Sequence, residues 1–387
     1  MAHGTAQKFT IAVPDAVLTD LRERLARTRL PGEVRDSGWD YGTNLAYLKE
    51  LIEYWRTQYD WRKHERELNA FDHFKVTING CNIHFIHQPG VGPNPKPLLL
   101  LHGWPGSIAE FQQIIPMLTD PARHGGEPAD AFTVVAPSLP GYGFSDDPGV
   151  PGMKIEPIAE IFYELMTQVL GYQRFGVQGG DWGSIIASRI GHAYPQSVIG
   201  VHLNMVALGP PEGRKALSGD EESKRFLDGM KKFSDNESGY QQIQGTKPQT
   251  LAYGLNDSPA GLAAWIVEKF RTWSDCGGNV ESRFSKDQLL TNITIYWVTQ
   301  SINSSTRLYY EARHSPYRLG PGERVGAPTA IALFPAEVIR PPRTYAEKAY
   351  NLKRWTEMPR GGHFAAMEEP ALLAGDIRAF FREAGQG

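Results

Sequence analysis

One short segment constrains the fold of this chain more than any other: Val177 to Ser184, with the sequence VQGGDWGS. An apolar run typical of a strand, Tyr172 to Val177, precedes it, and from Ile185 to Ile190 isoleucines recur at helical spacing. A strand that passes into a helix through Gly-Gly-X-X-Gly must turn tightly, and glycine relieves the crowding around a residue in a strained conformation. The segment therefore predicts a strand, a sharp elbow with Asp181 at its tip, and a helix.

Asp181 stands where the elbow of α/β-hydrolases carries a serine nucleophile. A serine that opened a strained ring or displaced a halide would form an ether, which water does not readily cleave. A carboxylate forms an ester instead, which water can cleave. Asp181 therefore predicts an enzyme that is alkylated on this carboxylate and then regenerated by hydrolysis.

The chain around the elbow alternates strands and helices. Pro97 to Leu101 is an apolar run of the length expected for a buried parallel strand, and Phe132 to Ala136 is a second strand. A helix is expected from Ile155 to Leu170, and another apolar strand from Val198 to Leu203 follows the elbow helix. This order is typical of a parallel sheet covered by helices on both faces.

The alternation stops between Ala207 and Gly320, a stretch rich in Tyr, Trp and Lys, and resumes afterwards. We expect cap helices over Phe226 to Phe233, Ala260 to Phe270 and Leu289 to Tyr310. After the cap we expect strands over Pro328 to Phe334 and Leu352 to Met358, and a closing helix from Pro370 to Phe381. Before the main domain, two amphipathic helices and a hairpin around Asn79-Gly80 are expected.

These patterns predict an α/β-hydrolase fold with an inserted helical cap and an N-terminal meander. The expected segments are residues 1–95 for the meander, 96–206 for the first part of the core, 207–320 for the cap and 321–387 for the second part of the core.

Three residues of the predicted fold follow strands and form a triad in chain order. Asp181 is the nucleophile, Glu337 follows the strand that ends at Phe334, and His363 follows a Gly-Gly pair after the last strand. Ligand sites of parallel sheets lie outside the carboxyl ends of the strands. His363 is therefore the expected general base, and Glu337 is expected to orient it and to stabilise its charged form.

The segment His102 to Pro105, with the sequence HGWP, follows the first core strand. In this fold one oxyanion-hole donor is the backbone N–H of the residue after the nucleophile, here Trp182, and the other comes from this loop. We expect Trp104 to supply that second donor, and a cis bond between Trp104 and Pro105. The two donors would stabilise the oxyanion that forms when water attacks the Asp181 ester.

Composition excludes several other function classes. The formal net charge of −3 offers no basic surface for nucleic acid. The two cysteines, Cys81 and Cys276, do not form a disulfide framework, and no Cys/His spacing resembles a zinc site, so neither metal nor cofactor is expected. The first ten residues contain no apolar run for a signal peptide or membrane anchor, so we expect a soluble, cytoplasmic protein. A homodimer is left open.

The sequence resembles the microsomal-type epoxide hydrolases over nearly its whole length. The resemblance is carried by the N-terminal meander, by His102 to Pro105, by Gly179 to Gly183, and by three further segments: Thr246 to Thr250 with Asp257 to Pro259, and Arg360 to Ala366. No apolar run like the N-terminal anchor of the microsomal members is seen here, so we expect a soluble relative, more like bacterial or fungal members.

The resemblance implies roles for two cap tyrosines, which in the family bind and protonate the epoxide oxygen. The segment Glu237 to Tyr240 matches the first and gives Tyr240, and Ser304 to Tyr309 matches the second and gives Tyr309. Tyr310 is adjacent to the second position. Pro335-Ala336-Glu337 matches the acid of the family's charge relay. A phenol is acidic enough to donate a proton and stays protonated at neutral pH.

The expected function is therefore hydrolysis of a small apolar or aryl epoxide to a vicinal diol, with water as the second substrate. Asp181 forms the ester, and water activated by His363 cleaves it. Trp104, Trp182, Tyr240 and Tyr309 are the expected substrate-binding residues. A haloalkane dehalogenase, which uses the same nucleophile, base and acid, and a non-catalytic hydrolase fold that binds an apolar ligand are the alternatives. The cap tyrosines disfavour the dehalogenase because a departing halide needs no proton.

Overall fold

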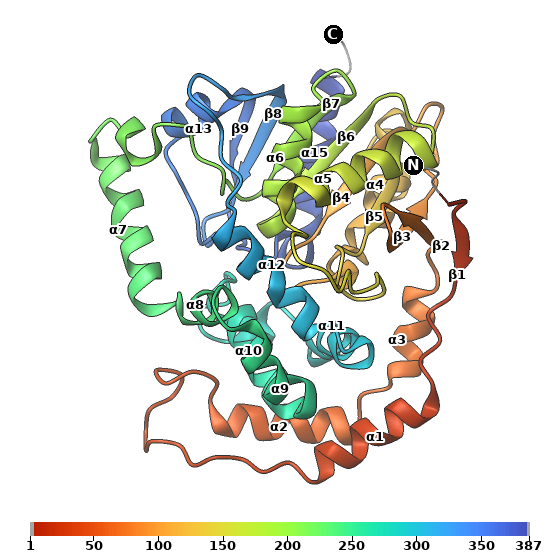
Figure 1. Ribbon diagram of the computed structural model, residues 1–387, viewed down its shortest axis with the longest axis vertical. Helices are drawn as coiled ribbons and strands as arrows, with labels where there is room; N and C mark the ends of the chain where they lie inside the picture. The colour runs from red at the N-terminus through yellow and green to blue at the C-terminus, as the bar shows by residue number, and fades with distance from the viewer. Residues whose placement is uncertain (1–3, 385–387) are drawn as a thin grey trace.

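A single nine-stranded sheet runs through the core of the molecule, for which a computed structural model describes residues 4–384. Its strand order is β1-β2-β3-β5-β4-β6-β7-β8-β9 (Figure 1). The strands are β1 (Gln7–Phe9), β2 (His73–Ile78), β3 (Cys81–Gln88), β4 (Lys96–Leu101), β5 (Phe132–Pro137), β6 (Phe175–Gly179), β7 (Val198–Leu203), β8 (Val325–Leu333) and β9 (Tyr350–Glu357).

The strands from β5 to β9 in this order are parallel, whereas β1, β2 and β3 are antiparallel additions at one edge. Parallel strands need crossover helices on both faces, which explains the continuous apolar runs in these strands. Helices α5 (Ile155–Glu164) and α6 (Asp181–Ala193) pack together on one face, and α4 (Ile114–Thr119) and α15 (Pro370–Ala384) pack together against the other. The expected α/β-hydrolase fold is thereby confirmed.

The N-terminal segment contributes to both halves of the molecule. The hairpin of β2 and β3 extends the sheet, with β3 paired to β5. The three helices before it, α1 (Asp15–Ala26), α2 (Leu45–Thr57) and α3 (Trp61–Leu68), pack against cap helices. Hydrogen bonds reinforce this packing, including one from the Tyr54 hydroxyl to Asp287 at 2.8 Å. The segment therefore ties the cap to the sheet.

Between β7 and β8 the chain forms the expected helical cap. Its helices are α7 (Glu221–Asn236), α8 (Gly239–Gln244), α9 (Pro248–Asp257), α10 (Pro259–Thr272), α11 (Lys286–Thr299) and α12 (Ile302–His314). The single helix expected over Leu289 to Tyr310 is wrong, because Gln300 adopts a left-handed conformation with φ of 52° and ends α11. The expected helices also omitted α8 and α9, which are short and follow no long apolar pattern.

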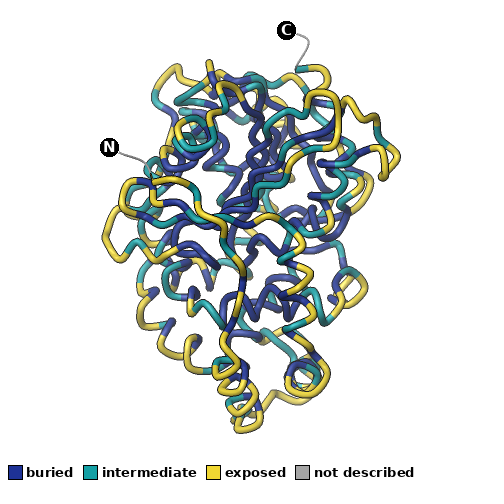
Figure 2. The backbone as a smooth tube through the Cα atoms, turned by 90° about the vertical axis from the view of Figure 1, so that its right-hand side faces the viewer, coloured by how far each residue is buried: buried dark blue, intermediate teal, exposed yellow. Residues whose placement is uncertain are grey.

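Buried backbone runs through the centre of the molecule, whereas loops and outer helices are exposed (Figure 2). The parallel strands form the most buried part, and Leu98, Leu99 and Val177 are completely inaccessible to solvent. Between residues 4 and 384, no helix combines the length and the apolar character that crossing a bilayer requires. The carboxyl ends of β4, β6, β8 and β9 all face the cap, and the candidate site lies there.

Candidate active site

Asp181 lies at the tip of a sharp turn between β6 and α6, in a left-handed conformation with φ of 47°. Close packing around this turn requires glycine at two positions, one before and one after Asp181. A Cβ at Gly179 would lie 2.2 Å from the carbonyl oxygen of Gly183, and a Cβ at Gly183 would lie 2.3 Å from that of Leu101. Side chains at either position would push the elbow away from the sheet. The glycine spacing seen in the sequence therefore serves to place the Asp181 carboxylate above the strands.

Backbone amides surround this carboxylate. The Trp104 amide donates a hydrogen bond to Asp181 Oδ1 at 2.8 Å, and the bond between Trp104 and Pro105 is cis. A Cβ at Gly103 would lie 2.1 Å from the same oxygen, so the loop approaches Asp181 closely only because glycine precedes Trp104. Trp182 lies in the first turn of α6, where backbone N–H groups have no partner within the helix. The Trp104 amide thus contacts the carboxylate directly, and the Trp182 amide belongs to the helix turn that begins at Asp181.

The structure brings His363 and Glu337 together with Asp181. His363 Nε2 lies 3.4 Å from Asp181 Oδ2, and His363 Nδ1 lies 2.9 Å from Glu337 Oε1. The loops that carry them are linked, because the amide of Ala336 donates to the carbonyl of Gly361 at 3.1 Å. The imidazole therefore bridges two carboxylates, and its ring orientation is fixed by both.

Burial alone would lower the pKa of His363, but the negative charges of Glu337 and Asp181 outweigh it and raise the pKa well above its ordinary value. The two neighbouring carboxyl groups therefore favour the protonated form of His363. An ester bond at Asp181 would remove that negative charge and with it one of the causes that raise the pKa of His363. Loss of that charge favours the neutral imidazole, which can then accept a proton.

Tyr240 from α8 and Tyr309 from α12 meet above the elbow. Their rings are 5.7 Å apart; Tyr240 stacks on Trp104 at 5.4 Å, and Tyr309 meets Trp182 edge-on at 4.8 Å. Tyr309 is 5% exposed, whereas the adjacent Tyr310 is 39% exposed, so the chain directs Tyr309 and not its neighbour toward the elbow.

Burial raises the pKa of both phenols, and the charge of Asp181 raises both further. The pKa of Tyr309 lies well above its ordinary value. Both hydroxyls therefore remain protonated over the whole physiological range and can donate to an oxygen placed between them and Asp181.

A small internal cavity of about 20 Å³ borders the Asp181 side chain. Its lining comes from the core alone and includes Gly106, Glu110, Asn204 and His363 as well as Asp181. Glu110 carries a carboxyl group into this cavity, and sequence reasoning missed it. The only signal was an acidic residue within the apolar run from Ile108 to Phe111, shortly after the HGWP segment.

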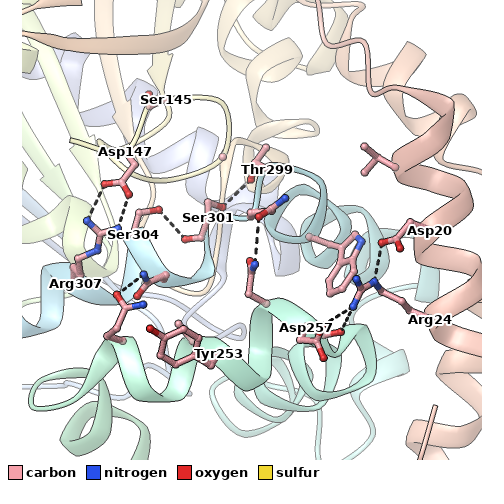
Figure 3. A pocket seen from close by; sticks show the side chains of 18 of the residues that line it. Asp20, Arg24, Ser145, Asp147, Tyr253, Asp257, Thr299, Ser301, Ser304 and Arg307 are labelled. Carbon is pink, nitrogen blue, oxygen red and sulfur yellow. Dashed lines mark hydrogen bonds and ion pairs between the residues drawn. The ribbon is translucent and has the colours of Figure 1, made fainter. Parts of the chain in front are cut away.

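A larger groove of about 770 Å³ lies elsewhere on the molecule, between α1, α9 and the segments 143–147 and 297–307 (Figure 3). Ion pairs cross its walls: Arg24 binds Asp20 and Asp257, and Arg307 binds Asp147. These charges satisfy one another, and the groove contains none of the residues that surround Asp181. Size alone therefore does not locate the chemistry of this protein.

Trp273 is a second residue near Asp181 that the sequence did not reveal. Its backbone carbonyl accepts from the His363 amide at 2.9 Å, and its ring lies 5.1 Å from both Tyr240 and His363. In the part of the chain that the structure describes, no three His, Cys, Asp or Glu side chains gather so as to hold a metal ion. The groups around Asp181 can act as nucleophile, base and proton donors.

Comparison with known proteins places these features in a family. Residues 6–111 match the family model described as epoxide hydrolase N terminus, and residues 96–277 match the model of the alpha/beta hydrolase fold. Epoxide hydrolase 1 of Oryctolagus cuniculus is 43% identical, over 96% of this chain and 88% of the relative.

Two solved structures are similar over nearly their whole length. The juvenile hormone epoxide hydrolase of the silkworm Bombyx mori superposes with a TM-score of 0.92 at 36% identity, covering 99% of this chain and 95% of the other. The epoxide hydrolase of Aspergillus niger gives a TM-score of 0.86 at 31% identity, covering 98% and 97%.

Proposed function

The chain belongs to the epoxide hydrolases of the α/β-hydrolase superfamily, and we propose that it opens its substrate through a covalent ester on Asp181. The expected family, fold and enzyme class are confirmed by these relatives. The roles of individual residues are proposals, and the geometry around Asp181 supports them.

In the first step, Asp181 Oδ2, the oxygen that the Trp104 amide does not bind, attacks an epoxide carbon, and the bond from that carbon to the ring oxygen breaks. Tyr240 and Tyr309 bind the ring oxygen from the opposite side, and one of them gives it a proton as the bond opens. The phenol then regains a proton from solvent. The product is a hydroxyalkyl ester of Asp181, and the His363 imidazolium, which has lost one of its two anionic partners, releases its proton to solvent.

In the second step, neutral His363 takes a proton from a water whose oxygen attacks the Asp181 carboxyl carbon. The Trp104 amide, already 2.8 Å from Oδ1, and the Trp182 amide stabilise the resulting oxyanion. Each such donor is worth about 3 kcal/mol in related chemistry. The intermediate collapses, its bond to the diol oxygen breaks, and the His363 imidazolium protonates the leaving diol. Asp181 is then a carboxylic acid, and its remaining proton passes to His363, which restores the carboxylate and the imidazolium. Glu337 stabilises the imidazolium throughout.

The contact of His363 with both Asp181 and Glu337 is the observation that carries this proposal. It is tested with His363→Gln, which keeps the nucleophile but lacks the base. Styrene oxide should increase the mass of this variant by one substrate, with the adduct on the peptide that contains Asp181. The matched control, Asp181→Asn, should remain unmodified. An unmodified His363→Gln protein that still binds the epoxide would refute the covalent route.

A haloalkane dehalogenase activity is a second candidate, and one observation favours it. The buried indole N–H groups of Trp104 and Trp182 have no hydrogen-bond partner among the described residues, and such groups can bind a departing halide. Tyr240 and Tyr309 favour the epoxide, because only its oxygen needs a proton. Release of chloride from a 1-chloroalkane, measured beside diol formation from an epoxide, separates the two activities.

The proposed partners are a small apolar or aryl epoxide and water. The rings of Trp104, Tyr240 and Trp273 pack together beside the elbow and support an aryl substituent, since they offer apolar surface. A cytoplasmic location and a homodimer stay predictions of the sequence. The relatives favour an enzyme over the non-catalytic ligand-binding alternative.

A further inference from the structure

Lys269, in the last turn of cap helix α10, places a buried positive charge next to one of the two phenols. The residue is 6% exposed, and its ammonium nitrogen lies 4.9 Å from the ring centre of Tyr240 and 5.8 Å from that of Trp273. A cation over an aromatic face is attracted by the electrons of the ring, and the attraction is strongest where water is excluded. The two chemical steps described above do not use this charge.

The ion pair of Lys269 does not by itself explain why the ammonium is buried. In the part of the chain that the structure describes, its one carboxylate partner is Glu268, the preceding residue. The side chain of Glu268 is 22% exposed and that of Lys269 is 7% exposed, so the cation is the more buried member of the pair. Burial of an ammonium group is costly, and an ion pair at the surface avoids that cost. The buried position therefore indicates that the charge acts on the rings it contacts.

The two phenols differ in their surroundings. Among residues 4–384, no lysine or arginine lies over the ring of Tyr309, which meets Trp104 and Trp182 edge-on. Burial is the main cause that raises the pKa of both phenols, but the hydrogen bond between them lowers the pKa of Tyr240 and raises that of Tyr309. Negative charge is therefore stabilised better on Tyr240 than on Tyr309.

Carboxylates near Tyr240 oppose its ionisation, and Lys269 lies where it offsets them. After burial, the charges of Asp181, Glu237 and Glu268 contribute to the raised pKa of Tyr240. Burial and the charge of Glu268 also raise the pKa of Glu237, and the charge of Lys269 opposes them. The field of the ammonium therefore reaches the beginning of α8, where Tyr240 lies.

We propose that Lys269 makes Tyr240 the phenol that gives up its proton when the epoxide opens. The inference rests on the proposed function, in which two phenols bind the ring oxygen. As the bond from carbon to ring oxygen breaks, the Tyr240 proton moves to that oxygen and leaves a phenolate next to the ammonium. Tyr309 donates a hydrogen bond to the same oxygen and keeps its own proton. The phenolate regains a proton from solvent after the ring has opened.

This contact speeds ring opening because it becomes stronger as the reaction proceeds. An ammonium over a neutral phenol meets only the quadrupole of the ring, whereas an ammonium over a phenolate meets a full negative charge. Interactions that are stronger in the transition state than in the ground state are the ones that lower the barrier. Lys269 is thus a positioning residue, which acts through Tyr240 and not on the substrate itself.

The first measurement is a single turnover of styrene oxide, stopped with acid so that the protein adduct can be weighed. Lys269→Met keeps a long side chain and removes the charge. It should form the Asp181 ester about tenfold more slowly, which is a part of the 10²–10⁴-fold that a general acid contributes. Hydrolysis of the ester should keep its wild-type rate, because Tyr240 has no part in that step.

Double variants show whether Lys269 acts through Tyr240. In the Tyr309→Phe background, where Tyr240 is the remaining phenol, Lys269→Met should again slow ester formation by about tenfold. In the Tyr240→Phe background, the same substitution should leave the rate of ester formation unchanged, since the group on which the charge acts is gone. A merely structural role in the cap would slow ester formation equally in both backgrounds.

Glu268→Gln is the matched control for the ion pair. It breaks the same pair from the other side and keeps the ammonium over the ring. Its ester formation should be no slower than that of the wild type, because the carboxylate that it removes disfavours the phenolate. Urea unfolding of Glu268→Gln and Lys269→Met shows how much stability each loses, independently of the rates.

The proposal is overturned if Lys269→Met forms the ester at the wild-type rate, if its loss is equal in the two phenylalanine backgrounds, or if Glu268→Gln reproduces that loss. If Lys269→Met does not fold, Lys269→Gln, which is neutral and can still hydrogen-bond to Glu268, is measured in the same two backgrounds and decides in the same way.

Failure of the proposed function gives different results. Absence of any ester in the wild type and in His363→Gln would refute the covalent route. Wild-type rates of ester formation in both Tyr240→Phe and Tyr309→Phe would refute the role of the phenols. Neither result depends on the charge of Lys269.

Discussion

The Asp181 carboxylate meets a different group on each side. The Trp104 amide binds one oxygen, His363 lies beside the other, and two phenols lie above on the cap. In the proposed mechanism these groups act at different moments: the phenols when the ring opens, and the imidazole and the amides when the ester is cleaved. Because different groups act in ester formation and in ester hydrolysis, a single substitution should slow one of these steps and leave the other unchanged.

Removal of a phenol should slow ring opening. In Tyr240→Phe or Tyr309→Phe, the rate constant of ester formation should fall by about 10²-fold, because one general acid remains. The double variant should form no detectable ester. Rapid-quench measurement of the protein adduct checks this, with Tyr310→Phe as the control because Tyr310 is exposed and stacks on His314. A Tyr310→Phe variant slower than Tyr309→Phe would contradict the assignment.

The raised pKa of the phenols has a consequence for pH dependence. A phenol donates only below its pKa, and the upward shift at Tyr240 and Tyr309 extends the protonated range to higher pH. Ester formation should therefore show no loss from phenol ionisation up to about pH 10, the ordinary value. Stopped-flow measurement across this range checks the expectation. A decline centred below pH 10 that disappears in Tyr309→Phe would disprove it.

Site residues could be predicted from the sequence where a side chain suited to the chemistry follows a predicted strand. Asp181, Glu337 and His363 each follow a strand of one parallel sheet, so their meeting at one edge could be expected. Glu110 and Trp273 could not be identified in this way. Their significance arises from cavities and ring contacts between segments far apart in the chain, which no local pattern encodes.

The elbow is the element on which the site depends, and its tolerance for side chains is small. In Gly183→Ala the new Cβ would meet the Leu101 carbonyl at 2.3 Å, and backbone atoms cannot easily move away. We expect a loss of about 1–3 kcal/mol in unfolding free energy and a large loss of turnover, since Asp181 would shift. Urea unfolding and diol formation measure the two effects.

Gly229 in α7 provides the matched control for this substitution. A Cβ there meets nothing within 4 Å, and the residue lies inside an exposed helix. Gly229→Ala should therefore stabilise the protein by about 0.5–1 kcal/mol, because glycine is a poor helix residue, and should leave turnover unchanged. Equal destabilisation by both substitutions would show that crowding at the elbow is not the cause.

The elements of the core could be predicted more completely than those of the cap. The central core strands β4, β6 and β7 are mostly apolar and buried, so they were found with ends displaced by at most a few residues. The break between α11 and α12 was missed because Gln300, a residue without special turn preference, adopts the left-handed conformation that glycine usually supplies. Tertiary contacts decide that conformation, not local sequence.

At the scale of the whole molecule, one buried carboxylate joins the last helix to two strands. Asp376 of α15 lies 3.0 Å from His202 Nε2 in β7, and it accepts hydrogen bonds from Arg354 and Thr356 of β9 at 2.8 and 2.7 Å. Its side chain is 3% exposed. Replacement of one partner in such a buried network costs about 3–5 kcal/mol. Asp376→Ala should lose stability of that order in urea unfolding. Glu383→Ala, which removes only the exposed ion-pair partner of Arg354, should have little effect.

Acid should weaken the same connection. Burial alone would raise the pKa of Asp376, but His202, Thr356 and Arg354 outweigh it and lower the pKa below the ordinary value. A depressed folded-state pKa stabilises the protein above the unfolded value, near 4, and this contribution is lost as the pH falls further. The melting temperature of the wild type should therefore fall more steeply below about pH 4 than that of Asp376→Ala. Parallel curves would contradict this role.

The arrangement of the molecule as a whole followed from the sequence only in outline. The order of core, cap and core is visible in the pattern of strands and helices. The sequence does not reveal that the N-terminal helices pack against the cap while the hairpin after them extends the sheet. This arrangement depends on long-range contacts such as that between Tyr54 and Asp287. These contacts fix the cap, and with it Tyr240 and Tyr309, above Asp181.

The covalent role of Asp181 is tested most directly by one turnover of an epoxide in ¹⁸O-labelled water, with enzyme in excess over substrate. Water attacks the carboxyl carbon in this account, so the diol oxygen comes from the unlabelled aspartate. The first diol should therefore carry no label from water, and the label should appear in the peptide that contains Asp181. A first diol that carries ¹⁸O, with an unlabelled Asp181, would show that water attacks the epoxide directly.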